Sequence, residues 1–150
     1  MLEPGVSAPA IELPDPAGAT HNLHDALQNG PVVLAFYKVS CPTCQMTLPF
    51  LERLAASANL IAISQDDARD SREFNHRFGI SVPTLLDSRP YAVSNAYRIT
   101  NVPSIFVVEP DGRISSAVSG FNKAALEKLG ERFGAPVFRD ADRVPDLRPG

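Results

Sequence analysis

The sequence lacks tryptophan, contains only two cysteines and has no long apolar segment. Two cysteines are too few for a disulfide-stabilised scaffold. No apolar run approaches the roughly 20 residues that cross a bilayer, so no membrane span is expected. Positive charge is not in excess either, because the net charge is −3 and the isoelectric point is near 5.5. A nucleic-acid partner is therefore not expected.

The N-terminal sequence MLEPGVSAPAIELP has no basic patch and no apolar segment of the signal-peptide kind. A cytoplasmic location is therefore the expectation from the sequence. The alternative is the periplasm, if a leader peptide has been removed.

The length of 150 residues predicts a single domain, residues 1–150. The apolar runs Val32–Tyr37 and Leu60–Ser64 each precede a helical pattern, which is typical of parallel strands joined by crossover helices. The further expected elements are short strands near Ile11–Leu13 and Thr20–Leu23, a helix at Asp66–Phe78, a strand at Thr84–Leu86, a helix at Pro90–Tyr97, a hairpin of Ser104–Val108 and Ile114–Val118, and a helix from about Asn122 to Phe133. Residues 134–150 have no periodicity and are expected to form an extended, mobile tail.

Both cysteines lie in one tetrapeptide, Cys41-Pro42-Thr43-Cys44, between a predicted strand and a predicted helix. A cross-link that closes so short a loop stabilises little, so the spacing indicates chemistry. Proline is favoured at the first helical position, which predicts Cys41 at the helix N-cap and Cys44 one turn further on. The free N–H groups and the helix dipole at that end favour a thiolate at Cys41.

Cys44 shares an apolar helical stripe with Leu48 and Leu51, so we expect its thiol to be more buried than that of Cys41. Pro49 lies inside the same helix and is expected to kink it. These placements predict the order of thiol–disulfide exchange. Cys41 is the nucleophile that attacks a substrate disulfide, and Cys44 is the resolving thiol.

The segment PVVLAFYKVSCPTCQMTLPFLERL resembles the strand–CxxC–helix core of the thioredoxin-like superfamily, in its redoxin/TlpA-like branch bordering AhpC/TSA. APAIELPDPAGATHNLHDAL is similar to that branch's N-terminal hairpin, and YRITNVPSIFVVEPDGRI to its cis-proline strand and hairpin. The resemblance covers about residues 8–133. It implies an α/β, thioredoxin-like three-layer fold, with a central mixed sheet, flanking helices, an N-terminal hairpin extension and an extended C-terminal tail.

Two prolines match the cis-proline motif of the family. Pro83 is followed by only three strand residues, whereas Pro103 leads into a full strand and a hairpin, so we assign the motif to Pro103. The resemblance implies a cis Val102–Pro103 bond, with the backbone of Val102 beside Cys41 and able to pair with an extended substrate. The expected substrate-binding residues are Val102, Pro103, Ser40, Pro42 and Thr43.

The sequence departs from the family at several positions. Ser40 precedes the first cysteine, where many relatives have tryptophan. The buried acid of thioredoxin falls on Ala35, and the acid of some TlpA-like relatives falls on Thr47. Either carboxylate would help to take the proton from the resolving thiol, so the base for Cys44 has no assignment. Lys38 is expected to be a solvated lysine, with a role beside the thiolate as the alternative.

Three other functions stay open. His21 and His24 form an HxxH that, with the CxxC, would make a Cys2His2 zinc site, although positions i and i+3 of a strand face opposite ways. A peroxiredoxin-like thiol peroxidase would carry threonine three residues before its reactive cysteine, where this chain has Lys38 or Cys41. A non-catalytic thioredoxin-like scaffold would dock a partner around Val102 and Pro103.

The sequence thus predicts a thiol–disulfide oxidoreductase that uses the CPTC dithiol, with no metal and no cofactor. Its expected partners are a disulfide-containing protein or a small thiol substrate, and an upstream dithiol reductant. In the cytoplasm such a dithiol is mostly reduced and acts as a reductase.

Overall fold

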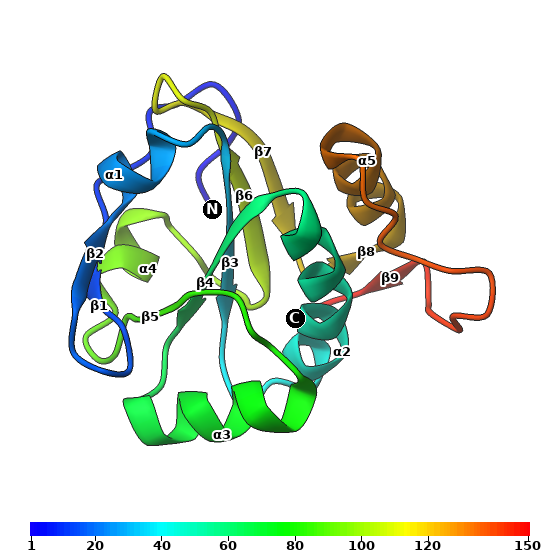
Figure 1. Cartoon of the computed structure of the whole chain (residues 1–150), viewed down its shortest axis with the longest axis horizontal. Coiled ribbons are helices and arrows are strands. Elements are labelled where there is room, and N and C mark those ends of the chain that lie inside the picture. The colour runs from blue at the N-terminus through cyan, green and yellow to red at the C-terminus, as the bar shows by residue number, and fades with distance from the viewer.

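The computed structural model describes residues 1–150, and at its centre lies a five-stranded mixed sheet in the order β5-β4-β3-β6-β7 (Figure 1). Strands β3, β4 and β5 run parallel, whereas β6 pairs antiparallel with both β3 and β7. The strands are β3 (Val32–Tyr37), β4 (Asn59–Ser64), β5 (Thr84–Leu86), β6 (Ser104–Val108) and β7 (Ile114–Ser119).

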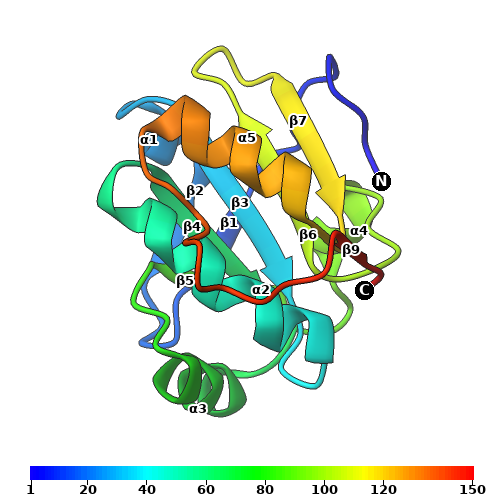
Figure 2. The ribbon, with the colours of Figure 1, turned by 90° about the vertical axis from the view of Figure 1, so that its right-hand side faces the viewer.

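Helices cover both faces of the sheet. Helices α2 and α5 lie on one face, and α1 and α4 lie on the other, as the edge-on view of Figure 1 shows. Figure 2 looks onto the α2 and α5 face. The helices are α1 (Leu23–Leu27), α2 (Pro42–Glu52), a 3-10 turn η1 (Arg53–Ala56), α3 (Ala68–Phe78), α4 (Ala92–Ala96) and α5 (Lys123–Phe133).

The central strand β3 is buried on both faces, as its unbroken apolar run predicts. Because successive side chains of a strand alternate, Val33 and Tyr37 join a core cluster with α2 and α5, and Leu34 joins a second cluster with α1 and α4. The CPTC motif follows β3, so it lies at the C-terminal end of the central strand, and the sheet that carries it is packed on both faces.

The N-terminal hairpin is present as β1 (Glu12–Pro14) and β2 (Thr20–Asn22). Some boundaries differ from the expectation. Helix α3 begins at Ala68 because Asp67 is its N-cap and accepts a hydrogen bond from the Asp70 N–H. The short helix α1 has too few residues to show a period in the sequence, and it was not predicted.

The tail, residues 134–150, differs most from the sequence expectation. It forms no helix, but its first half is packed against the domain. Val137 is only 2% exposed, and the ring of Phe138 lies 5.0 Å from Phe50 and 5.8 Å from Phe121. Arg53 also donates to the carbonyl of Val137. Apolar packing thus fixes a segment that has no sequence periodicity.

An ion pair adds a second anchor for the tail. The Arg53 guanidinium lies 2.6 Å from the Asp142 carboxylate, and the Arg139 N–H donates to the same carboxylate. The hydrogen bond from Arg53 lowers the pKa of Asp142 to about 2. Beyond this anchor, β9 (Leu147–Arg148) pairs antiparallel with β8 (Phe121–Asn122). Figure 2 shows the tail, in red, crossing α2 and returning to the start of α5.

We expect Phe138→Ala to lower the free energy of unfolding by about 2 kcal/mol, because a half-buried ring between two aromatic side chains is lost. Leu147→Ala, in the same tail, is the control. Its side chain is largely exposed, so the change should stay within about 0.5 kcal/mol. Urea unfolding followed by circular dichroism measures both. Equal stability of the two variants would contradict the packing described for the tail.

Candidate active site

Cys41 is the N-cap residue of α2, and Pro42 occupies the first turn of the helix. The Sγ atom of Cys41 accepts a hydrogen bond from the Cys44 backbone N–H at 3.1 Å. One of the free N–H groups at a helix start is thus directed at the sulfur. This geometry, with the positive end of the helix dipole, stabilises negative charge on Cys41. The cysteine side chain is partly exposed, so a substrate can reach it.

Cys44 lies one turn further along α2 and is fully buried, in agreement with its place on the apolar stripe. It packs in the same cluster as Leu48 and Leu51. Burial is the main cause that raises the pKa of the Cys44 thiol far above its ordinary value, and the hydrogen bond with Cys41 raises this pKa further. At neutral pH Cys44 is therefore a protonated, shielded thiol.

The loop before β6 approaches the motif from the other side. The Cys41 thiol donates to the Val102 carbonyl at 3.3 Å, and the Val102–Pro103 bond is cis. Pro103 is buried, whereas Val102 is partly exposed. The resemblance implied both the isomer and the proximity, and the structure contains both. The Cys41 sulfur and the Val102 carbonyl are thus side by side.

Two side chains hold the loop that precedes Cys41. The Asp66 carboxylate accepts from the Val39 N–H at 2.8 Å, and the Gln45 amide donates to the Val39 carbonyl at 3.0 Å. Neither Asp66 nor Gln45 was singled out in the sequence. The first follows β4 rather than β3, so only the parallel pairing of these strands brings it to the motif.

The other predicted substrate-binding residues beside Cys41 differ in exposure. Pro42 and Ser40 are exposed beside Cys41, whereas Thr43 is buried and donates a hydrogen bond to the tail.

The ammonium of Lys38 lies over the ring of Tyr91, 5.6 Å from its centre. The hydroxyl of Thr47 donates to the Thr43 carbonyl inside α2, so it is engaged within the helix.

The tail also reaches the site, contrary to the mobile tail expected from the sequence. The Thr43 hydroxyl donates to the Pro149 carbonyl at 2.8 Å, across 106 positions of sequence. Gly150 lies against the backbone of Val102. In both Figure 1 and Figure 2 the chain end marked C lies near the start of α2. No motif marks these contacts, because the tail uses backbone atoms.

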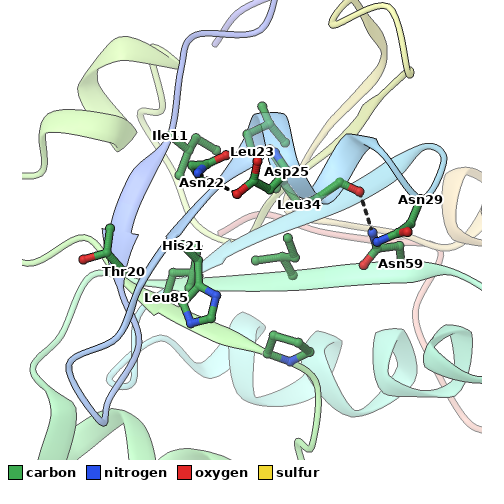
Figure 3. A pocket seen from close by; sticks show the side chains of 13 residues that line it. Ile11, Thr20, His21, Asn22, Leu23, Asp25, Asn29, Leu34, Asn59 and Leu85 are labelled. Atoms are coloured by element: carbon green, nitrogen blue, oxygen red, sulfur yellow. Dashed lines mark hydrogen bonds between the residues drawn. The ribbon is translucent and has the colours of Figure 1, made fainter.

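The two histidines of the HxxH lie away from the cysteines. The His21 imidazole is 2.7 Å from the Asp15 carboxylate, and His21 lines a pocket of about 360 Å³ beside Leu34 and Leu85 (Figure 3). Those two leucines belong to the core cluster on the opposite sheet face from Cys44. No three His, Cys, Asp or Glu side chains cluster as metal ligands. The geometry therefore does not join the HxxH and the CxxC.

Comparison with known proteins gives a consistent result. The model of the AhpC/TSA family matches residues 4–117. The thiol-disulfide oxidoreductase ResA of Geobacillus kaustophilus is 29% identical over 122 residues, which cover 77% of this chain and 69% of that protein.

Two solved structures have the same architecture at low identity. Peroxidoxin BcpB from Mycobacterium tuberculosis has a TM-score of 0.76 at 23% identity, covering 89% of this chain and 96% of that one. A secreted disulfide oxidoreductase of the same organism, homologous to DsbE of E. coli, has a TM-score of 0.68 at 22% identity, covering 83% and 94%. These likenesses confirm the thioredoxin-like α/β fold.

Proposed function

The chain belongs to the AhpC/TSA family, and on that premise we propose that it is a thiol–disulfide oxidoreductase in which Cys41 is the nucleophile and Cys44 the resolving thiol. The observation that carries the proposal is the pairing of an N-cap cysteine with a buried partner one helical turn away. Similarity to ResA, a thiol-disulfide oxidoreductase, supports it.

The exchange proceeds in two steps. The Cys41 thiolate attacks one sulfur of a substrate disulfide, so a Cys41–substrate bond forms and the substrate S–S bond breaks. The second substrate sulfur leaves as a thiolate and takes a proton from water. Cys44 then attacks Cys41 Sγ, which forms the Cys41–Cys44 disulfide and breaks the Cys41–substrate bond. The first substrate sulfur leaves as a thiol, with the proton that Cys44 gives up. Two electrons pass from the protein dithiol to the substrate.

The surroundings of each cysteine suit its step. The Cys44 N–H, 3.1 Å from Cys41 Sγ, stabilises the attacking thiolate. Burial keeps Cys44 protonated until the mixed disulfide has formed, so the two thiols do not compete for substrate. The exposed Ser40 and Pro42, with Val102 and Pro103 from the loop before β6, are the proposed substrate contacts.

The proposed partners are a disulfide-containing protein or small thiol substrate and an upstream dithiol that restores the reduced form. The compartment belongs to the same proposal. The similarity to a secreted disulfide oxidoreductase supports the periplasmic alternative over the cytoplasmic expectation. None of the helices combines the length and the apolar character that a membrane crossing needs.

We expect the reduced protein to reduce the disulfides of insulin, with one Cys41–Cys44 disulfide formed per turnover. Thiol titration before and after the reaction, with mass spectrometry of the oxidised product, measures this stoichiometry. The same preparation is to be assayed with hydrogen peroxide and for zinc content. Faster turnover of peroxide than of insulin would assign a thiol peroxidase instead. Tight binding of about one zinc without reductase activity would assign a metal site.

A further inference from the structure

The last five residues of the chain, 146–150, lie beside Cys41, against the Thr43 hydroxyl and the Val102 backbone. We call these five residues the strap, and the surface of Thr43 and Val102 that they cover the groove. The Asp146 carbonyl accepts from the Lys123 N–H, and Leu147–Arg148 add a short strand to β8. The Pro149 carbonyl then accepts a hydrogen bond from the Thr43 hydroxyl, and Gly150 lies against the Val102 backbone. The strap thus contacts Val102, a proposed substrate contact, and Thr43, which the sequence predicts as a substrate-binding residue.

Two glycines allow the strap to pack closely: Gly150 within the strap, and Gly120 in the chain beneath it. A Cβ atom at Gly150 would overlap the Val102 carbonyl oxygen and lie 2.7 Å from the carbonyl carbon. A Cβ atom at Gly120 would lie 2.7 Å from the Arg148 carbonyl oxygen. Neither glycine can take a side chain unless the strap or its bed moves. The Val102 carbonyl in question is the one that faces the Cys41 thiol.

The strap is weakly held, whereas the chain before it is firmly anchored. Every residue from 145 to 150 is exposed. The strap is held by the short β8 pairing, by hydrogen bonds to its backbone carbonyls, and by one side-chain hydrogen bond from the Arg148 guanidinium to Met46 Sδ at 3.9 Å. Upstream, Val137 is buried and Asp142 is paired with Arg53. Segments with few buried apolar contacts open at low free-energy cost. The strap can therefore leave the groove while residues 137–142 stay in place.

We propose that the strap is an internal competitor of substrate: it occupies the peptide groove beside Cys41 and must leave before an extended substrate segment can contact Val102. This inference rests on the proposed function only for the identity of the competing ligand. Because the anchor at Asp142 keeps the strap near the groove, its effective concentration is high without tight binding. Substrates that pair strongly with the groove are admitted, and weakly binding disulfides are disfavoured.

The test compares the wild-type chain with Gly150→Val and, as a matched control, Arg143→Ala. Valine at position 150 overlaps Val102 and should lift the end of the strap. Arg143 is an exposed residue of the same tail whose guanidinium reaches only the Asp140 carbonyl. Two rates are measured for each protein: alkylation of Cys41 by iodoacetamide, and kcat/KM for reduction of insulin.

We expect Gly150→Val to raise both rates between about 3-fold and about 10-fold, the factor that one ordinary hydrogen bond is worth. Arg143→Ala should match the wild type. Unchanged rates in Gly150→Val would overturn the inference, as would a lower kcat/KM, because the strap would then be part of the substrate site. Faster alkylation without insulin reduction by either protein would support the strap and overturn the proposed function.

Discussion

Cys41→Ser should abolish insulin reduction, with a loss of at least about 10³-fold, because no other thiol is placed to attack the substrate. Cys44 cannot replace it, since its thiol is fully buried and its pKa is raised by that burial. Serine is nearly isosteric with cysteine, so the helix N-cap should persist and the thermal midpoint should change little. A Cys41→Ser protein with near wild-type turnover would refute the assignment.

Cys44→Ala is expected to fail at the second step. It should attack a disulfide substrate through Cys41 and then accumulate as a mixed disulfide, visible by mass spectrometry as one substrate mass per chain. Alanine is preferred to serine here, because a hydroxyl in a fully buried apolar site adds a desolvation cost. The trapped adduct would also identify the natural partner. Peroxide turnover at the wild-type rate in this variant would instead make Cys41 a peroxidatic cysteine.

The two thiols should also differ strongly in reactivity. With the reduced native protein at pH 7, iodoacetamide should modify Cys41 at least about 100-fold faster than Cys44. Cys41 is partly exposed and capped by an N–H group, whereas Cys44 is enclosed and protonated. Peptide mapping after timed quenching measures the two rates. Both cysteines should react alike in urea, which serves as the control. Faster modification of Cys44 in the native protein would contradict the site geometry.

The raised pKa of Cys44 also sets a pH dependence of stability. The unfolded thiol ionises near pH 8.5, whereas the buried thiol stays protonated well above that value. The contribution of Cys44 to stability is therefore present below about pH 8.5 and is lost as the pH rises above it. Urea midpoints of the reduced protein should fall between about pH 8.5 and 10, and Cys44→Ala should show a smaller fall. Identical profiles would exclude this burial effect.

Much of the site could be predicted from local sequence because its determinants are close together. Pro42 at the first helical position and the apolar stripe through Cys44 predict the N-cap and the buried thiol without reference to the rest of the chain. The position of the cis bond before Pro103 could not be predicted from local sequence in the same way. Pro83 has a similar sequence context, and only the resemblance and the length of the following strand separated the two.

The sequence alone thus determined the strands of the central sheet and helices α2 to α5, the two-sided burial of β3 and the separate surroundings of Cys41 and Cys44. Each follows from apolar periodicity or from a helix-start signal a few residues long. Tertiary structure alone decided that Asp66 holds the loop before Cys41 and that Pro149 accepts the hydroxyl of Thr43. These contacts join distant segments through backbone atoms, and backbone N–H and C=O groups are the same in nearly every residue. No side-chain pattern records them, so only the folded chain shows where they meet.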